Sequence, residues 1–550
     1  MTRSEPVNSL RPRSAPWEVI GLILLAIFAS WVFFARLGQE TLKDWDEATH
    51  AQVAGEILST GDWITLHDRG LPYFNKPPLT FWLKAIAFRM GGINETTARF
   101  FPALFGWGSV LITAWFFGRL FDPWVGLLTG AILCTSWLFT LHHAGRSGEV
   151  DSTLIFFQLL TFAALWQSRH HPRWFWAAGV FTALGWMAKG STAYLPWPAA
   201  MIGMAMEHLR FPRMTEAKPT KRRWPHLLGG LAIAVALTLP WQFAMLAKHG
   251  RSFVATFYVS EGTLPAMQAI EHHPGDSLFY LQVLQAFFQP WLLLAASAIA
   301  WAIARRKEVR PQVFWTIAWA GIVLVACTFF ATKMVWYATP ALPALAALAA
   351  IACVELAKRR AGCLLLAAVA GYSAFQVTGQ FWSLASDTVA AALTLSGAWL
   401  LIAAPPAHDH RQLKLGALFI LVPLAFHFTV IRGVILHGDS VTSWTDLGID
   451  DEPWRDVRLH LDRDVPGRPI LLIGLPLNPA AYFYLHHLRI PVPVREAKKK
   501  SIGELLKSDP RTIVITRTEL VDDLRALGLQ SQFSEGALVL MSRPKSTAAD

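Results

Sequence analysis

Long apolar runs recur along this chain between residues 17 and 434, separated by short stretches that carry most of its charged side chains. About 20 consecutive apolar residues are enough for a helix to cross the hydrocarbon core of a membrane. The chain has 550 residues, of which 53% are hydrophobic and 16% charged. A soluble globular protein is about 25% charged. A single soluble core cannot bury so much apolar surface, so we predict an α-helical polytopic membrane protein.

The apolar runs predict about thirteen membrane-spanning helices. The first run follows Arg3, Arg11 and Arg13 and is long enough to span, so we interpret it as a retained signal anchor rather than a cleaved signal peptide. The predicted spans are 17–35, 98–117, 124–142, 151–167, 173–188, 191–206, 226–246, 277–304, 312–331, 337–356, 361–381, 388–404 and 415–434.

The formal net charge of +11 comes from basic side chains that gather in alternate junctions between the predicted spans. If the N-terminus lies in the cytoplasm, nearly all of these clusters also face the cytoplasm, as the positive-inside rule requires. The positive charge therefore indicates membrane orientation, and we expect no nucleic-acid partner. The clusters include Arg119, Arg169 with Arg173, Arg305 with Arg306, Lys358 to Arg360, and Arg411 with Lys414.

Two long segments, 36–98 and 247–276, would then lie on the outer side of the membrane. The first contains helix-like stretches with an apolar face at 48–58 and 79–90, and we expect these helices to lie along the membrane surface. We assign both segments, together with the spans, to a transmembrane domain of residues 1–436.

The composition changes after residue 436, where acidic residues become frequent and the apolar runs shorten. Short apolar runs typical of buried strands alternate there with helix-like segments, which predicts a small α/β domain at 437–550 on the outer side. The strand-like runs are 469–474, 512–516 and 537–542, and the helix-like segments are 478–487, 501–508 and 519–527.

The strongest chemical signal is the acidic sequence Asp44-Trp45-Asp46-Glu47, just outside the first span. One carboxylate at this position would cap the helix that follows. Three carboxylates exceed what capping needs, so we favour a functional role for Asp46 and Glu47 as a general base, as metal ligands or in binding a cationic sugar. The sequence leaves open whether a divalent cation takes part.

Lys76 lies in the sequence YFNKPPL, at 73–79, where the two prolines prevent a helix and hold the lysine at a turn. A fixed ammonium near lipid headgroups suits a lipid phosphate. A lysine that snorkels from an interfacial helix accounts for the same position equally well.

Further charged residues mark the outer ends of predicted spans. Asp151 begins a span, where helix capping or an ion pair with Arg146 would account for it. Lys189 and Lys333 lie on the side where lysine is rare, and Tyr337 follows Lys333 by one helical turn. With the acidic sequence and the YFNKPPL turn, these residues predict an outward cavity that transfers a group from a lipid phosphate.

In its motifs the chain resembles the bacterial membrane glycosyltransferases that include lipid A aminoarabinose transferase (ArnT) and are akin to protein O-mannosyltransferases. The resemblance covers most of residues 17–360. The motifs that carry it are Asp46-Glu47, GDW (61–63), YFNKPPL (73–79), INETTARFFPAL (93–104), the segment from Arg146 to Asp151, AKG (188–190), LPW (239–241), the aromatic run 279–291, and Lys333 with Tyr337.

This resemblance implies a GT-C fold and an enzyme of the bacterial inner membrane. Such an enzyme moves a sugar from a polyprenyl-phosphate donor to lipid A, another envelope glycan or a protein at the periplasmic face. It implies that Asp46 is the main catalytic carboxylate, and we assign Glu47 and Asp151 to the catalytic residues with it. Lys76 would hold the donor phosphate. The other residues assigned to substrate binding are Tyr73, His50, Arg146, Lys189, Lys333 and Tyr337.

The chain departs from the aminoarabinose transferases at three places. Thr49-His50 replaces a typical Arg-Tyr, Asn75 replaces a typical Glu, and a typical Glu-His-x-x-Arg segment is matched only by Glu261. These differences weaken the assignment of aminoarabinose and lipid A more than that of the reaction class. The alternative function is a transporter or flippase for a lipid-linked sugar, although transporter sites usually lie near the membrane midplane between repeated halves.

Overall fold

The structure of the protein is a computed structural model. It describes residues 16–43, 46–210, 223–269, 275–306, 309–377, 392–397, 399–401, 410–437, 511–535 and 538–543, with short stretches between 457 and 497. The chain forms two compact units. Unit 1 comprises Met1–Ala35, Phe74–Thr80 and Pro102–His437, and unit 2 comprises Arg36–Tyr73, Phe81–Phe101 and Gly438–Asp550. One boundary between the units falls after His437, next to the predicted boundary, and most of the first long outer segment groups with the C-terminal residues.

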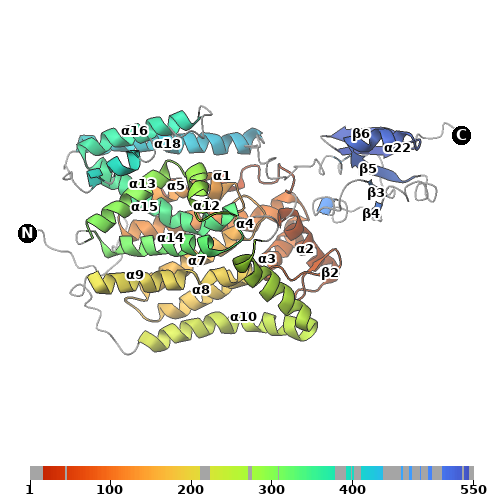
Figure 1. The fold of residues 1–550 in the computed structure, drawn as a ribbon, viewed down its shortest axis with the longest axis horizontal. Helices are drawn as coiled ribbons and strands as arrows, with labels where there is room; N and C mark the ends of the chain where they lie inside the picture. The colour runs from red at the N-terminus through yellow and green to blue at the C-terminus, as the bar shows by residue number, and fades with distance from the viewer. Residues whose placement is uncertain are drawn as a thin grey trace, which may run out of the picture. The chain divides into compact units, whose positions relative to one another are not determined.

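Unit 1 is a bundle of long apolar helices (Figure 1). Its most buried helix is α15 (Leu342–Ala357), in which every residue from Leu342 to Cys353 is buried. Six of those residues are alanines, whose small side chains let neighbouring helices approach closely. The packed pairs include α1 (Pro16–Phe34) with α5 (Pro123–Cys134), α7 (Asp151–Gln167) with α8 (Trp174–Lys189), α8 with α10 (Arg223–Phe253), α9 (Pro196–Arg210) with α14 (Pro311–Phe329), α13 (Trp291–Ala304) with α15, and α16 (Arg360–Val377) with α18 (His410–His437).

Most predicted spans coincide with a helix, but some are interrupted. The predicted span 277–304 is divided by Pro290, which lacks the N–H that a continuous helix needs. Parts of span 388–404 and the acidic residue Asp44 lie outside the described residues. The interrupted spans contain α5 and α6 (Trp137–Thr140), η1 (Gly190–Tyr194) and α9, α12 (Phe279–Phe287) and α13, and η3 (Val335–Ala341) and α15.

Among the described residues, five helices are long and apolar enough to cross a membrane. This agrees with the prediction of a multi-pass membrane protein. The five are Pro16–Phe34, Glu95–Leu120 (α4), Trp224–Met267, Pro311–Phe329 and Val335–Ala357.

The two helices expected along the membrane surface are present as α2 (Asp46–Thr60) and α3 (Leu79–Gly91). α2 does not bury only one face, as a helix along a membrane surface would: all its residues from Glu47 to Ile57 except Thr49 are buried. One side of α2 packs through Val53 and Ile57 against Phe81 of α3. A short hairpin of β1 (His67–Asp68) and β2 (Leu71–Pro72) connects the helices.

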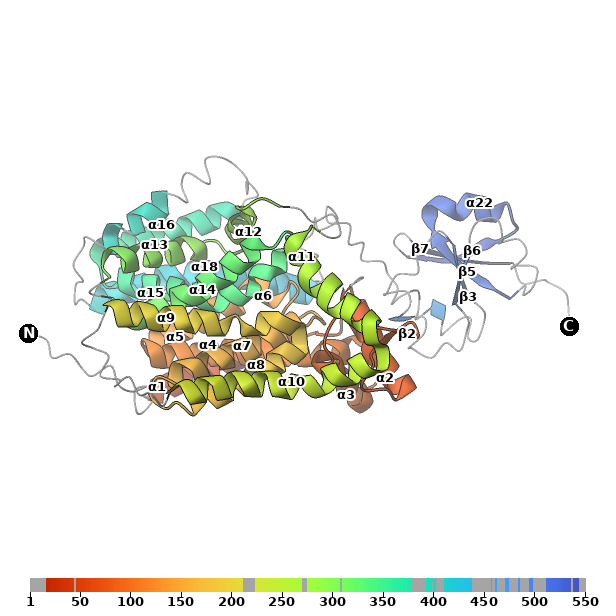
Figure 2. The ribbon, with the colours of Figure 1, turned by 60° about the horizontal axis from the view of Figure 1, so that its bottom comes forward.

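The C-terminal part of unit 2 contains a mixed five-stranded sheet, which confirms the predicted α/β character. β3 runs parallel to β4 and β5, whereas β7 runs antiparallel to β5 and β6. α22 (Val521–Arg525) covers one face of the sheet (Figure 2) and packs against Leu471 and Ile473 of β3. The alternate residues of β3 belong to a second hydrophobic cluster, which contains Tyr484. The strand order is β4 (Val494–Ala497), β3 (Ile470–Ile473), β5 (Ile513–Arg517), β7 (Leu538–Ser542) and β6 (Gln530–Glu535).

Candidate active site

An ion pair joins the start of α7 to the end of α8 in unit 1. α7 begins at Asp151 and α8 ends at Lys189. Nζ of Lys189 donates a hydrogen bond to Oδ1 of Asp151 over 2.5 Å, and the two side chains expose only 15% and 3% of their surface. The N-cap position belongs to Val150, so Asp151 is the first helical residue and is held by a lysine of the neighbouring helix.

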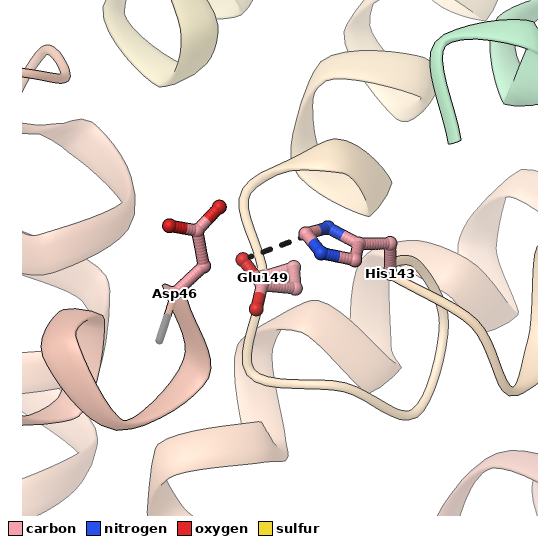
Figure 3. A group of neighbouring side chains, drawn as sticks. All are labelled: Asp46, His143 and Glu149. Atoms are coloured by element: carbon pink, nitrogen blue, oxygen red, sulfur yellow. Dashed lines mark ion pairs between the residues drawn. The ribbon is translucent and has the colours of Figure 1, made fainter. Parts of the chain in front are cut away.

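His143 lies beside the same carboxylate. Its Nδ1 is 3.8 Å from Oδ2 of Asp151 and 3.9 Å from Oε2 of Glu149, and Figure 3 shows the ring facing Glu149. The ring stacks on Trp336 of η3, with 3.7 Å between centroids and 6° between planes. We refer to Asp151, Lys189, His143 and Glu149 as the Asp151 cluster.

The backbone of His143 is left-handed, with a φ of 55°. This conformation is uncommon for a residue other than glycine, and it persists where the surrounding structure enforces it. It occurs in the turn region between α6 and α7, and the stack on Trp336 fixes the ring there.

Tyr337 and Lys333, which the sequence assigned to one cavity, have different surroundings. The ring centroid of Tyr337 is 5.6 Å from Nζ of Lys189, within cation–π range. Lys333 donates hydrogen bonds to the carbonyls of Thr328 and Phe330 over 2.5 and 2.6 Å. These carbonyls lie at the end of α14, so the Lys333 ammonium caps that helix.

Arg146 also binds the end of a helix. Its guanidinium donates to the carbonyls of Val32 and Ala35 over 2.6 and 2.8 Å. α1 ends at Phe34, so Arg146 satisfies carbonyls that the helix leaves without intrahelical partners.

Lys76 pairs with Glu261, which is distant in sequence but belongs to the same unit. Nζ of Lys76 lies 2.9 Å from Oε2 of Glu261, and both side chains are half-buried. Glu261 lies in the π-helical segment η2 (Val254–Thr263), which continues from α10. The ammonium at the YFNKPPL turn is therefore partly neutralised by a carboxylate that no local sequence pattern connects to it.

In unit 2, Glu47 and Arg99 form a bidentate ion pair, which we call the Arg99 pair. Nε and Nη2 of Arg99 donate to the two carboxylate oxygens of Glu47 over 2.7 and 2.9 Å. The side chains expose only 5% and 2% of their surface. Glu47 also accepts a hydrogen bond from the backbone N–H of Lys43. Arg99 additionally donates to the carbonyls of Leu37, Glu40 and Thr41.

Three other predicted site residues also lie in unit 2. Asp46 is half-buried at the first position of α2 and is drawn in Figure 3. His50 is buried one turn further along, with its ring 5.2 Å from that of Phe81. The ring of Tyr73 lies 5.7 Å from the same phenylalanine. His50 and Tyr73 are thus both packed against α3.

Tyr484 links the C-terminal residues of unit 2 to its N-terminal segment. Its hydroxyl donates to Oε1 of Glu95 over 3.1 Å and accepts from the N–H of Leu42 over 2.8 Å. Burial, and then the Glu95 carboxylate beside it, raise the pKa of the Tyr484 hydroxyl. The hydroxyl therefore remains protonated and able to donate.

The structure brings Asp151, Lys189 and Tyr337 together. The sequence reasoning missed His143 and Glu149 as site residues. Both lie in a polar stretch just before a predicted span, and that polarity beside a span was the one available signal.

The chain is similar in sequence to known membrane glycosyltransferases. A model of the family described as dolichyl-phosphate-mannose-protein mannosyltransferase matches residues 75–242. An undecaprenyl phosphate-α-4-amino-4-deoxy-L-arabinose arabinosyl transferase of Pseudomonas fluorescens is 30% identical over 340 residues, which cover 59% of this chain and 57% of that protein. A relative of the same description from Pseudomonas savastanoi is 30% identical over 58% of this chain and 59% of its own length. The chain thus matches less than two thirds of the length of these relatives.

The fold matches that of ArnT from Cupriavidus metallidurans. The apo structure of that protein aligns with a TM-score of 0.68 and 19% identity, covering 96% of this chain and 99% of that one. The structure bound to undecaprenyl phosphate aligns with a TM-score of 0.67 over 98% of this chain. The chain is therefore similar to ArnT-like membrane glycosyltransferases in sequence and has their fold, as predicted.

Proposed function

We propose that this protein is an integral membrane glycosyltransferase that moves a sugar from a polyprenyl-phosphate donor to an acceptor at the periplasmic face. The observation that carries the proposal is the Asp151 cluster, which holds two carboxylates, a histidine and a lysine against aromatic rings. The names of the relatives, which specify an undecaprenyl-phosphate-linked sugar, supply the donor class. The proposed orientation has a cytoplasmic N-terminus and a periplasmic C-terminal sheet.

The chemistry needs a base and a set of cations. An acceptor oxygen attacks the anomeric carbon, and its proton passes to a carboxylate, which we assign to Asp46. The bond between that carbon and the phosphate oxygen breaks, and direct displacement inverts the anomeric centre. Negative charge develops on the departing phosphate, and fixed ammonium groups stabilise it. We assign this role to Lys76, with Lys189 binding the sugar or its phosphate from the Asp151 cluster.

The geometry changes the role that we propose for Glu47. Both of its carboxylate oxygens accept from Arg99, and one also accepts from the backbone. A carboxylate so fully engaged is a weak base, so Glu47 and Arg99 position the start of α2, where Asp46 lies. Arg146 and Lys333 cap helices and support the site without contacting substrate.

The proposal is tested by incubating the purified protein in lipid nanodiscs with labelled polyprenyl-phosphate sugars and envelope acceptors. We expect labelled acceptor from the unaltered protein and from Asp523→Asn, an exposed control in unit 2. We expect none above background from Asp46→Asn. Transfer that persists in Asp46→Asn would remove Asp46 from the catalytic step.

A second assay, with the protein in sealed vesicles, separates the alternative functions. Donor that crosses the sealed bilayer without transfer to any acceptor would indicate the transporter or flippase. Repeating the transfer assay with a chelator and then with added Mg²⁺ or Mn²⁺ determines whether a divalent cation is needed. A panel of lipid A, other glycans and proteins identifies the acceptor.

A further inference from the structure

Lys76, to which we assign the donor phosphate, already carries a carboxylate. Nζ of Lys76 and Oε2 of Glu261 lie 2.9 Å apart, and the side chains keep 23% and 28% of their surface exposed. A phosphate oxygen that binds this ammonium must compete with the carboxylate for the same hydrogens. Because the protein leaves about a quarter of each side chain uncovered, an arriving anion can reach the pair.

Lys76 and Glu261 lie on segments that differ in how tightly they pack against the rest of the protein. Pro77 and Pro78, which follow Lys76, are buried. Phe74 on the same turn packs against the rings of His249 and Phe253 of α10, with centroids 5.0 and 5.8 Å away. The turn that carries the Lys76 ammonium is therefore fixed by packing.

Glu261 lies on a more loosely held segment. Of the ten residues of η2, Phe257 is the buried one. Gly250 interrupts the regular helix before this segment, with φ 54° and ψ −126°, a conformation suited to glycine. Few side chains of this segment pack inside the protein, so few protein contacts oppose its movement. The Glu261 carboxylate can therefore leave and return while Lys76 stays in place.

The charges of donor and product differ in a way that gives this pair a role. A polyprenyl-phosphate sugar is a phosphodiester with one negative charge. Loss of the sugar leaves a phosphomonoester that carries between one and two negative charges near neutral pH. An unopposed lysine would bind the product more strongly than the donor and would slow turnover.

We propose that Glu261 is a built-in counter-ion that competes with the departing polyprenyl phosphate for Lys76 and thereby promotes product release. This inference rests on the proposed function and concerns the step after sugar transfer. In each cycle the donor phosphate displaces Glu261 from Lys76, and Glu261 displaces the product.

The test compares product affinity in the unaltered protein, Glu261→Gln, Glu261→Asp and the exposed control Glu519→Gln. Equilibrium binding of undecaprenyl phosphate to protein in neutral-lipid nanodiscs is measured alongside the inhibition constant in the transfer assay. We expect Glu261→Gln to bind the product about 3- to 10-fold more tightly, since a competing half-exposed ion pair has been removed. The KM for the donor should fall less, because the donor carries less charge. Glu261→Asp keeps the charge on a shorter side chain and should bind the product more tightly than the unaltered protein but less tightly than Glu261→Gln, whereas Glu519→Gln should behave like the unaltered protein.

Unchanged or weaker product binding by a folded Glu261→Gln variant that still transfers sugar would overturn the inference and leave the proposed function intact. An equal decrease in the donor KM and in the product inhibition constant would also overturn it. The inference requires Glu261 to weaken binding of the more highly charged product more than binding of the donor. An unaltered protein that neither binds undecaprenyl phosphate nor transfers sugar would overturn the proposed function as well.

Discussion

The Asp151 cluster and the Arg99 pair are both buried ion pairs with an acid in the first turn of a helix, yet they differ in how completely their hydrogen bonds are satisfied. Arg99 binds both oxygens of Glu47 and three backbone carbonyls. Among the described residues, the ammonium of Lys189 makes one hydrogen bond, to Asp151, and the histidine beside it lies beyond normal hydrogen-bond distance. An ion pair whose hydrogen-bonding groups are all satisfied rigidifies the fold. Charged groups that can still form hydrogen bonds can act on a substrate.

Replacing Arg99 should have the largest effect on folding. Arg99→Met leaves Glu47 buried without its cation, which costs about 3–5 kcal/mol of unfolding free energy. We expect a large decrease in the yield of folded protein and in the thermal unfolding temperature. Arg525→Met, at an exposed arginine that also pairs with a carboxylate, is the control and should change neither. A stable Arg99→Met protein would show that the Arg99 pair is not needed for the fold.

Replacing Lys189 should affect chemistry more than folding. Lys189→Met removes a cation from the site, and we expect sugar transfer to fall by about 10²-fold or more. The loss of stability should be smaller than in Arg99→Met, because His143 remains next to Asp151. Transfer rate and unfolding temperature are measured on the same preparation. A variant that unfolds like Arg99→Met would assign Lys189 to the scaffold.

Replacing the imidazole of His143 should have an intermediate effect. His143→Phe keeps a ring to stack on Trp336 but removes the group that faces Glu149 and Asp151. We expect about a 10-fold loss of transfer with little change in unfolding temperature, as for a residue that acts through the carboxylates. Full activity would confine His143 to a packing role.

The smallest effect is expected at Tyr484 in unit 2. Tyr484→Phe removes its hydrogen bonds with Glu95 and Leu42, which should cost about 1–2 kcal/mol of stability. Transfer per folded molecule should not change. A selective loss of transfer would show that this contact serves the active site.

The helical spans and the C-terminal strands could be predicted because their signals are local. Long apolar runs predicted the helices α1, α4, α7 and α14, and short apolar runs predicted the strands β3, β5 and β7. β4 and β6 were missed, because Arg495 and Glu496 in β4 and the polar residues of β6 interrupt any apolar run. The break at Pro290 follows from proline chemistry, but the long apolar stretch around it obscured it.

The candidate site was predicted less completely, because its partners come from distant elements. Asp151 and Lys189 each stood out by position, but only helix packing shows that they pair. No local pattern connects Glu47 with Arg99 or Lys76 with Glu261, which are 52 and 185 residues apart. Arg146 and Lys333 looked alike as outer cations, and their capping of helix ends depends on where those helices stop.

The contrast between the two regions is tested most directly by the transfer rates of Asp151→Asn and Glu47→Gln, each expressed per folded molecule. Both substitutions remove one carboxylate charge while nearly preserving shape. We predict that Asp151→Asn folds and loses transfer by about 10²-fold or more, whereas folded Glu47→Gln transfers sugar at close to the unaltered rate. Normal transfer by Asp151→Asn, together with loss of transfer in folded Glu47→Gln, would contradict the account.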